Sequence, residues 1–353
     1  MSAAGPVSAA GILLGVWLSA GAALALLLFL IVYKVGRSAV ESWRGRRRDA
    51  FSPALDALIA GAPQAAAQLR PRLWGDADII EDMLARTAAA ISGDLRDEVV
   101  RAASELGLTR RRIRQLRSPS IHDRAFAAER LGLLGGEEAV PPLLDALSRE
   151  RSGARRVIIR ALGRLRSPRA LSALLRLLEY DGELPGAPVA QALLSCGEAA
   201  APDLLRTAEA PCRGRAQALA LLGQMKILDA VPILIEAMSE DPNPAVREAA
   251  AQAAGRLAHP DALHALRGAL RDGAPRVRAQ AAWALGRVAD PAAAEDLESA
   301  LDDSDWWTRA RAAEALSRLG ETGLERLRRL AGGADGPKRR LAEEMLASVE
   351  IER

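Results

Sequence analysis

An internal repeat constrains the fold of this chain more than any other feature. Two clear copies are VREAAAQAAGRLAHPDALHALRGAL at 246–270 and VRAQAAWALGRVADPAAAEDLESAL at 277–301. A small marker residue ends the same apolar stretch in six copies: Gly132, Gly163, Gly223, Gly255, Gly286 and Ser317. With Leu193 as the equivalent in a divergent third copy, the markers are almost evenly spaced along the chain. This regularity, with a period of about 31 residues, predicts a stack of about seven structural repeats.

Each repeat is predicted to contain two helices. In the sixth copy, apolar residues recur at helical spacing up to Val288, and Asp290-Pro291 then breaks the pattern. Three copies carry a proline nine residues after the marker, where proline is tolerated in the first turn of a second helix: Pro141, Pro202 and Pro232. Small Gly and Ala residues allow close helix packing, which explains why only 3% of the chain is aromatic.

An aspartate precedes an arginine by six positions at three repeat boundaries, and Glu209 precedes Arg215 by the same spacing. The aspartate pairs are Asp241 with Arg247, Asp272 with Arg278, and Asp303 with Arg309. With this feature, residues 118–353 resemble HEAT-like repeat proteins, in particular the short bacterial repeats of the bilin-lyase (PBS-lyase) HEAT-like group. The resemblance implies an all-α solenoid in which the acid–arginine pairs link neighbouring repeats. We expect exposed pairs, each worth under ~1 kcal/mol, and none in the first three repeats.

The remaining parts of the chain are also predicted to be helical. Residues 49–117 form either a divergent N-terminal cap or a small bundle, and 336–353 read as a closing amphipathic helix. Segment 180–189 of the third repeat contains two Gly and two Pro, which favours a longer loop or a bend in the solenoid.

The N-terminal region is predicted to cross a membrane. Residues 11–33 form a run of 23 uncharged residues, which as a helix would span about 34 Å. We therefore divide the chain into 1–33, 34–48, 49–117 and 118–353. Four small residues at four-residue spacing are a candidate contact with another transmembrane helix, although small residues are common in this segment: Gly11, Gly15, Ser19 and Ala23.

The basic charge of the chain is concentrated beside this uncharged run. Six positive residues lie within 34–48: Lys34, Arg37, Arg44, Arg46, Arg47 and Arg48. They predict a single-pass bacterial inner-membrane protein with its N-terminus outside and its repeats in the cytoplasm. A contact with anionic lipid is a second interpretation of the same cluster. Residues 49–353 carry 42 positive and 44 negative side chains, a balance that argues against a nucleic-acid partner.

Few residues suit catalysis or metal binding. The chain has three histidines and two cysteines, and neither they nor any motif predicts a metal, a cofactor or a catalytic site. Only a loose analogy links Cys212 with bilin attachment. Trp306-Trp307 is the most unusual local feature, because Trp is enriched at the centres of protein interfaces. The alternative is that one or both cover the neighbouring repeat.

These features predict a membrane-anchored scaffold that binds proteins rather than an enzyme. By resemblance alone, the partner would belong to an envelope or polysaccharide membrane complex. The alternative functions are a bilin lyase or isomerase and, less favoured, a nucleic-acid-binding HEAT-like protein.

Overall fold

The computed structural model describes residues 9–62, 64–180, 186–333 and 336–352, and within these ranges all regular structure is helical. The chain forms two compact units, Met1–Arg111 and Arg112–Arg353. Their boundary lies six residues before the predicted start of the repeats at 118.

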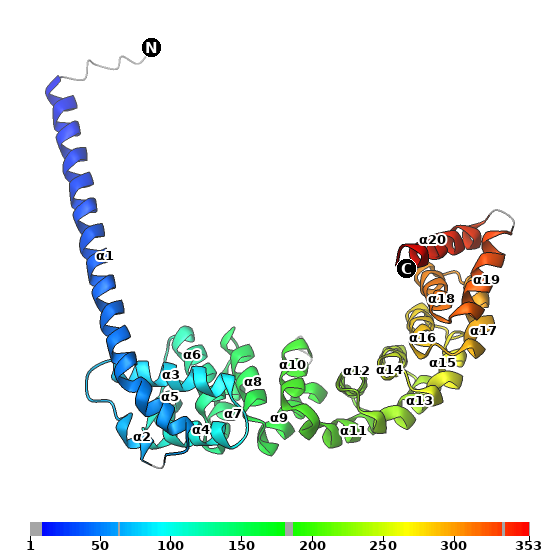
Figure 1. The fold of residues 1–353 in the computed structure, drawn as a ribbon, viewed down its shortest axis with the longest axis horizontal. Coiled ribbons are helices and arrows are strands. Elements are labelled where there is room, and N and C mark those ends of the chain that lie inside the picture. The colour runs from blue at the N-terminus through cyan, green and yellow to red at the C-terminus, as the bar shows by residue number, and fades with distance from the viewer. Residues whose placement is uncertain (1–8, 63, 181–185, 334–335, 353) are drawn as a thin grey trace. The chain divides into compact units, whose positions relative to one another are not determined.

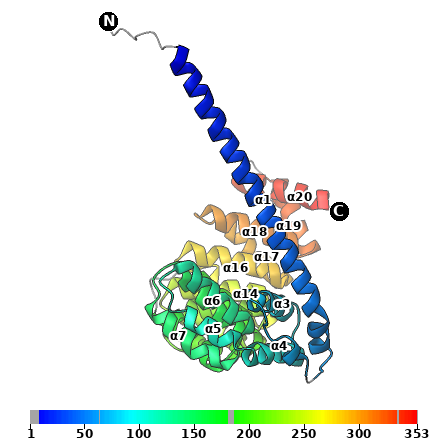
Figure 2. The same cartoon turned by 90° about the vertical axis from the view of Figure 1, so that its left-hand side faces the viewer.

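The first unit is built on one long helix. Figures 1 and 2 show the small helices of this unit beside the C-terminal part of α1. Phe51 and Leu58 of α1 are buried there, together with Ile80 and Leu84 of α3. The elements are α1 (Ala9–Ile59), α2 (Ala65–Gln68), α3 (Asp76–Ala90) and α4 (Asp94–Glu105), and α5 (Leu108–Gln115) crosses the unit boundary.

The predicted transmembrane helix is not confirmed. Among the described residues, no helix combines the length and the apolarity needed to cross a membrane. Residues 11–33 belong to α1, and its described side chains from Leu24 to Tyr33 are exposed. The candidate contact residues Gly11, Gly15, Ser19 and Ala23 have helical backbone, but their side chains lie outside the described residues.

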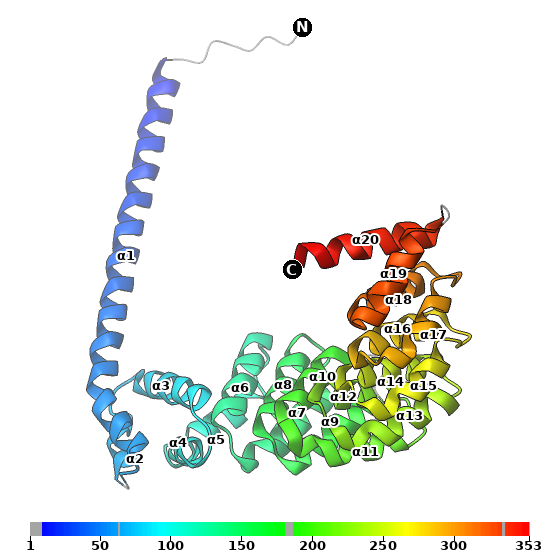
Figure 3. The ribbon, with the colours of Figure 1, turned by 45° about the vertical axis from the view of Figure 1, so that its right-hand side comes forward.

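The second unit is a stack of seven helix pairs, which confirms the all-α solenoid. In Figure 3 the first helix of each pair lies on the concave side of this unit and the second helix on the convex side. The pairs are α6 (Ile121–Leu134) with α7 (Val140–Arg149), α8 (Ala154–Leu165) with α9 (Pro168–Tyr180), α10 (Gly186–Cys196) with α11 (Ala201–Glu209), α12 (Arg215–Met225) with α13 (Val231–Glu240), α14 (Pro244–Leu257) with α15 (Leu263–Ala269), α16 (Pro275–Val288) with α17 (Ala294–Ala300), and α18 (Trp306–Arg318) with α19 (Glu321–Ala331).

Local sequence explains where these helices begin and end. Pro141, Pro202 and Pro232 all lie in the first turn of a second helix, as predicted. Short 3₁₀ turns precede five of the second helices: η1 (Glu137–Ala139), η2 (Gly197–Ala200), η3 (Leu228–Ala230), η4 (Pro260–Ala262) and η5 (Pro291–Ala293). Four first helices end at a residue with left-handed backbone conformation, three positions after the marker: Arg166, Lys226, Ala258 and Ala289. This conformation ends the helix and turns the chain toward the second helix.

The marker glycines are required where successive first helices touch. A Cβ atom at Gly132 would lie 2.7 Å from the Cα of Ala161, and one at Gly223 would lie 2.5 Å from the Cα of Ala253. Gly163, Gly255 and Gly286 face an alanine of the next first helix in the same way. We call this set of Gly–Ala contacts the first-helix seam.

The third repeat breaks the first-helix seam, one residue away from the predicted position. Gly163 faces Ala192, so the marker equivalent is Leu194 rather than Leu193. The alanine position of the next helix is occupied by Leu221. With leucine at both positions, α10 and α12 cannot approach closely, and they contact each other sparsely. Residues 181–185, within the predicted loop or bend, lie outside the described residues.

The C-terminal helix α20 (Pro337–Glu352) closes the stack. It packs against α18 and α19. Ala342 is fully buried, while Leu341 and Met345 are partly buried against the common core. This arrangement covers the apolar face of the last repeat, as a capping element must.

Replacing Gly223 with leucine should destabilise the solenoid by about 1–3 kcal/mol, because the new side chain would overlap Ala253. Urea unfolding followed by circular dichroism measures this change. Gly268→Ala is the matched control, since nothing lies within 4 Å of its added Cβ. That variant should be neutral or more stable by about 0.5 kcal/mol. Equal destabilisation of both variants would contradict the close-packing explanation.

Candidate functional site

Arginine–carboxylate pairs connect consecutive repeats, and we call this series of pairs the arginine ladder. The guanidinium of Arg247 donates to both carboxylate oxygens of Asp272, at 2.6 and 2.9 Å. Arg278 binds Asp303 in the same two-pronged way, at 2.6 and 2.7 Å. The Asp272 carboxylate also accepts the backbone N–H of Ala274 at 2.8 Å. Each acid therefore orders its own loop and binds the preceding repeat.

The partners in this ladder differ from those predicted. Arg247 does not bind the Asp241 carboxylate six residues before it; its Nη1 donates to the Asp241 backbone oxygen at 2.8 Å. Asp241 instead pairs with Arg215, at 2.7 Å. Arg309, at the end of the ladder, donates to the Asp303 backbone oxygen at 2.7 Å. Among the described residues, four arginines cap the preceding loop and also bind a carboxylate of the next loop: Arg124, Arg215, Arg247 and Arg278.

The ladder also begins earlier and is more buried than expected. In the first repeat Arg124 pairs with Glu150 at 2.7 Å. The side chains of Arg247 and Asp272 are only 18% and 9% exposed. The hydrogen bond from Arg247 lowers the pKa of Asp272 despite the opposing effect of burial. Arg124 likewise lowers the pKa of Glu150, to about 2.

The basic cluster at 34–48 is partly used inside the first unit. Arg47 forms a two-pronged bond to the fully buried Asp76, at 2.9 and 2.6 Å. This contact is the main reason that the pKa of Asp76 falls to about 2. Arg37 pairs with Glu41 at 2.9 Å. Exposed side chains complete the cluster: Lys34, Arg44, Arg46 and Arg48. Arg47 is therefore a structural residue, not a free contact for lipid.

Asp76 organises a loop that sequence reasoning missed. Its carboxylate accepts the backbone N–H groups of Arg72 and Leu73, at 3.0 and 2.8 Å. Gly75 has a φ of 88° that favours glycine, and Trp43 packs against it. The loop presents Trp74, whose side chain is 96% exposed. Trp74 follows Pro71 and directly precedes Gly75, residues that interrupt a helical pattern, and this context was the sequence signal that could have found it.

One histidine and both cysteines make structural contacts. Nδ1 of His259 accepts the backbone N–H of Asp261 at 3.3 Å, which caps η4. Cys196 is buried, and burial raises the pKa of its thiol. Cys212 contacts the backbone oxygen of Thr207 at 3.6 Å. Within the part of the chain that the structure describes, no cluster of His, Cys, Asp or Glu suits a metal ion.

Trp306 and Trp307 begin α18 and both face solvent. Their side chains are 54% and 61% exposed, and their rings meet edge to face at 4.7 Å. The Asp305 carboxylate caps the helix by accepting the backbone N–H of Thr308 at 2.9 Å. Thr308 is fully buried and fixes this first turn against the preceding repeat. The two indoles thus sit on a rigid helix end.

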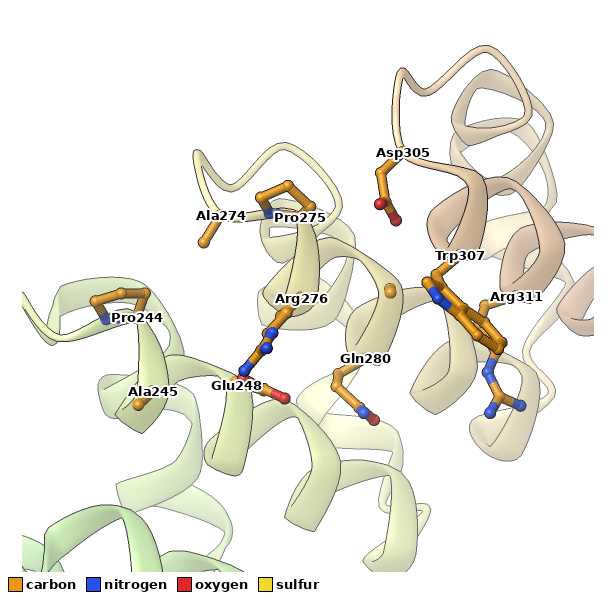
Figure 4. A pocket seen from close by; sticks show the side chains of 11 residues that line it. Pro244, Ala245, Glu248, Ala274, Pro275, Arg276, Gln280, Asp305, Trp307 and Arg311 are labelled. Carbon is orange, nitrogen blue, oxygen red and sulfur yellow. The ribbon is translucent and has the colours of Figure 1, made fainter.

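A groove of about 780 Å³ lies beside Trp307. It spans the N-terminal ends of three consecutive first helices. In Figure 4, Arg276 and Glu248 lie on one side of it, Trp307 and Arg311 lie on the other, and Gln280 lies between them. The remaining lining residues are Pro244, Ala245, Ala274, Pro275, Ala279 and Asp305. The groove therefore combines an aromatic anchor, flat proline and alanine surface, and charges of both signs.

A family model described as HEAT repeats matches residues 109–194, 201–277 and 269–347. These segments cover well over half of the chain. The chain belongs to the HEAT repeat family. This match confirms that the repeats are HEAT repeats, while their assignment to the bilin-lyase group stays a prediction.

Several solved structures are similar to this chain. One is a chain of the CpcE–CpcF phycocyanin lyase complex from Nostoc sp. PCC7120, which is 25% identical. The match covers 68% of this chain and 94% of that chain, with a TM-score of 0.33. Human deoxyhypusine hydroxylase is 20% identical, with coverage of 78% and 97% and a TM-score of 0.32. A chain from the Kap95p–RanGDP structure is 14% identical, with coverage of 83% and 50% and a TM-score of 0.46. No curated protein matches.

The arginine ladder should make the free energy of unfolding depend on pH. Because folding lowers the pKa of Glu150 from 4.5 to about 2, its charged form stabilises the folded state above about pH 4.5. This contribution, about 2–3 kcal/mol, should fall as the pH drops toward 2. Glu150→Gln should lose it, so urea unfolding of the wild type and the variant should differ at neutral pH and converge in acid.

Asp145→Asn is the control for this experiment. Asp145 pairs with Arg149 at the surface, with both side chains more than half exposed, so its loss should cost less than about 1 kcal/mol. A Glu150→Gln effect that stayed constant from neutral to acid pH would contradict the ladder's electrostatic role.

Proposed function

We propose that this protein is a HEAT-repeat scaffold that binds a partner protein in the groove across its last three repeats. The observation that carries this proposal is the position of Trp307, exposed at the edge of that groove. In a chain with 3% aromatic residues, two adjacent exposed Trp side chains form an uncommon concentration of apolar contact area. A buried Trp anchor is typical of the centre of a protein interface.

The composition of the groove also supports a protein partner. Apolar walls from Pro275 and Ala279 would bury side chains, and Arg276 and Glu248 would contact polar groups at the rim. Since the walls come from three repeats, the groove depends on their correct stacking. A continuous surface of this kind is what solenoids provide to extended partners.

The surroundings of the cysteines favour the scaffold over a bilin lyase or isomerase. A thiol acts as a nucleophile in its deprotonated form, and burial holds Cys196 in the protonated form. Cys212 lies at the start of the fourth repeat and does not line the groove. The scaffold proposal therefore assigns no catalytic residue and no cofactor.

Membrane attachment is a separate part of the proposal. It rests on the uncharged sequence of residues 11–33 and on the exposed apolar side chains of the described residues Leu24–Tyr33. The basic residues that follow this segment favour a cytoplasmic repeat domain. Anchoring would raise the effective concentration of the scaffold beside a membrane complex.

A photocrosslinking residue placed at Arg276 should trap one defined partner in cells, because this side chain lines the groove. Adding Trp307→Ala should reduce that adduct at least tenfold, since truncating a Trp hot spot removes about 2 kcal/mol or more of binding energy. Mass spectrometry identifies the partner, and purified partner then allows the affinity to be measured directly.

The matched control places the crosslinker at Glu236 on the convex helix α13, where the side chain is exposed. It should trap other proteins or none. Trp74→Ala controls for general loss of an exposed indole, because Trp74 lies in the first unit. If Trp307→Ala left the adduct and the affinity unchanged, the groove would not be the binding site.

Membrane attachment predicts a simple fractionation result. The full chain should stay with membranes during alkaline extraction, whereas a variant lacking residues 11–33 should be released. A reporter that is active only in the cytoplasm should be active when it is fused after Arg353. Release of the full chain would contradict the membrane anchor. A periplasmic reporter signal would contradict its orientation.

A further inference from the structure

The charge of the repeat array is strongly uneven along its length. Residues 118–180, which form the first two repeats, contain 11 arginines and seven acidic residues, a net charge of +4. Residues 181–353 contain 21 positive and 27 negative residues, a net charge of −6. The basic charge therefore belongs to the first two repeats, and an opposite charge on a ligand would select this end of the stack.

Three of these arginines follow one face of α8. Arg156, Arg160 and Arg164 are four residues apart, so they lie above one another on the helix. Arg156 and Arg160 are exposed and Arg164 is half-buried. We call this set the α8 arginine row.

The α8 arginine row differs from the arginines of the ladder. Arg124, Arg247 and Arg278 are all bound to carboxylates of the next repeat. Among the described residues, no ion pair satisfies the α8 arginine row. Its charge is therefore available to a ligand, whereas the charge of the ladder is already neutralised inside the fold.

The neighbouring helices leave this row accessible. One repeat later, α10 carries small or neutral side chains at the equivalent positions: Ala187, Gln191 and Ser195. One repeat earlier, α6 carries Ala125, Glu129 and Leu133. Arg156 is itself equivalent to Ala279, which lines the groove in the sixth repeat. The row therefore occupies the same helix face as the groove, four repeats away.

The spacing of the row fits an extended acidic peptide. Four helical residues rise about 6 Å, and alternate side chains of an extended strand are about 6.6 Å apart. Carboxylates at alternate positions could thus meet successive guanidinium groups. Duplex nucleic acid is less suited, because its affinity comes from neutralising many phosphates at once and the row offers three guanidinium groups in single file.

We infer that the α8 arginine row binds an extended acidic segment of a partner protein. This inference rests on the proposed scaffold function and adds the chemistry of a contact outside the groove. It also gives the partner a polarity: an acidic segment at the first repeats and an apolar anchor at the last ones.

The test uses the full chain in mild detergent and a fluorescent peptide of alternating Glu and Ser. Fluorescence anisotropy should show binding that weakens with salt, and the matching Gln–Ser peptide should bind far more weakly. The variant R156Q/R160Q/R164Q should bind the acidic peptide roughly tenfold more weakly. The control R213Q/R256Q/R287Q removes the same charge from later repeats and should change affinity less than about twofold.

Circular dichroism of both triple variants verifies that they fold. Equal binding of the Glu and Gln peptides, or equal losses in the two variants, would overturn the inference. Tighter, row-dependent binding of an oligothymidylate of the same length would overturn it in favour of nucleic acid. Because the Trp307 crosslinking experiment does not involve this peptide, either proposal can fail while the other stands.

Discussion

The contact between a glycine of one first helix and an alanine of the next determines how this solenoid stacks. At Gly132, Gly163, Gly223, Gly255 and Gly286, a single added Cβ would lie within 3 Å of neighbouring backbone. The first helices therefore approach closely, and they occupy the concave side of the unit. The aromatic-poor composition follows from this geometry, because small residues replace bulky side chains where the backbones meet.

The arginine ladder depends on the same stacking. When first helices lie in register, an arginine in the first turn reaches both the preceding loop and the carboxylate of the next repeat. The junction between repeats three and four lacks both the Gly–Ala contact and the arginine–carboxylate pair. Leu194 and Leu221 replace the small seam residues, Gly186 occupies the ladder arginine position, and Glu209 remains exposed. This junction is therefore the least constrained step in the stack.

Periodicity was sufficient to predict the helix pairs and the proline positions, whereas it left open whether Trp306 and Trp307 are exposed. The arginine partners, the marker position in the third repeat and the groove depend on distances in space, which the spacing of residues along the sequence does not give. An arginine that follows one loop's acid also precedes the acid of the next loop, and only the fold selects the second partner. Adjacent leucines likewise hide a one-residue shift between Leu193 and Leu194. The groove required three repeats at their actual separation, so no single motif indicated it.

The balanced charge of residues 49–353 was a misleading average. Electrostatic interactions at a protein surface are screened within about 8 Å at physiological ionic strength, a distance much shorter than a stack of seven repeats. A ligand at α8 therefore responds to the charge of the nearest repeats, a net +4 for residues 118–180, and not to the total. Arg156, Arg160 and Arg164 lie in single file and offer few phosphate contacts, and this geometry, rather than the net charge, disfavours duplex nucleic acid.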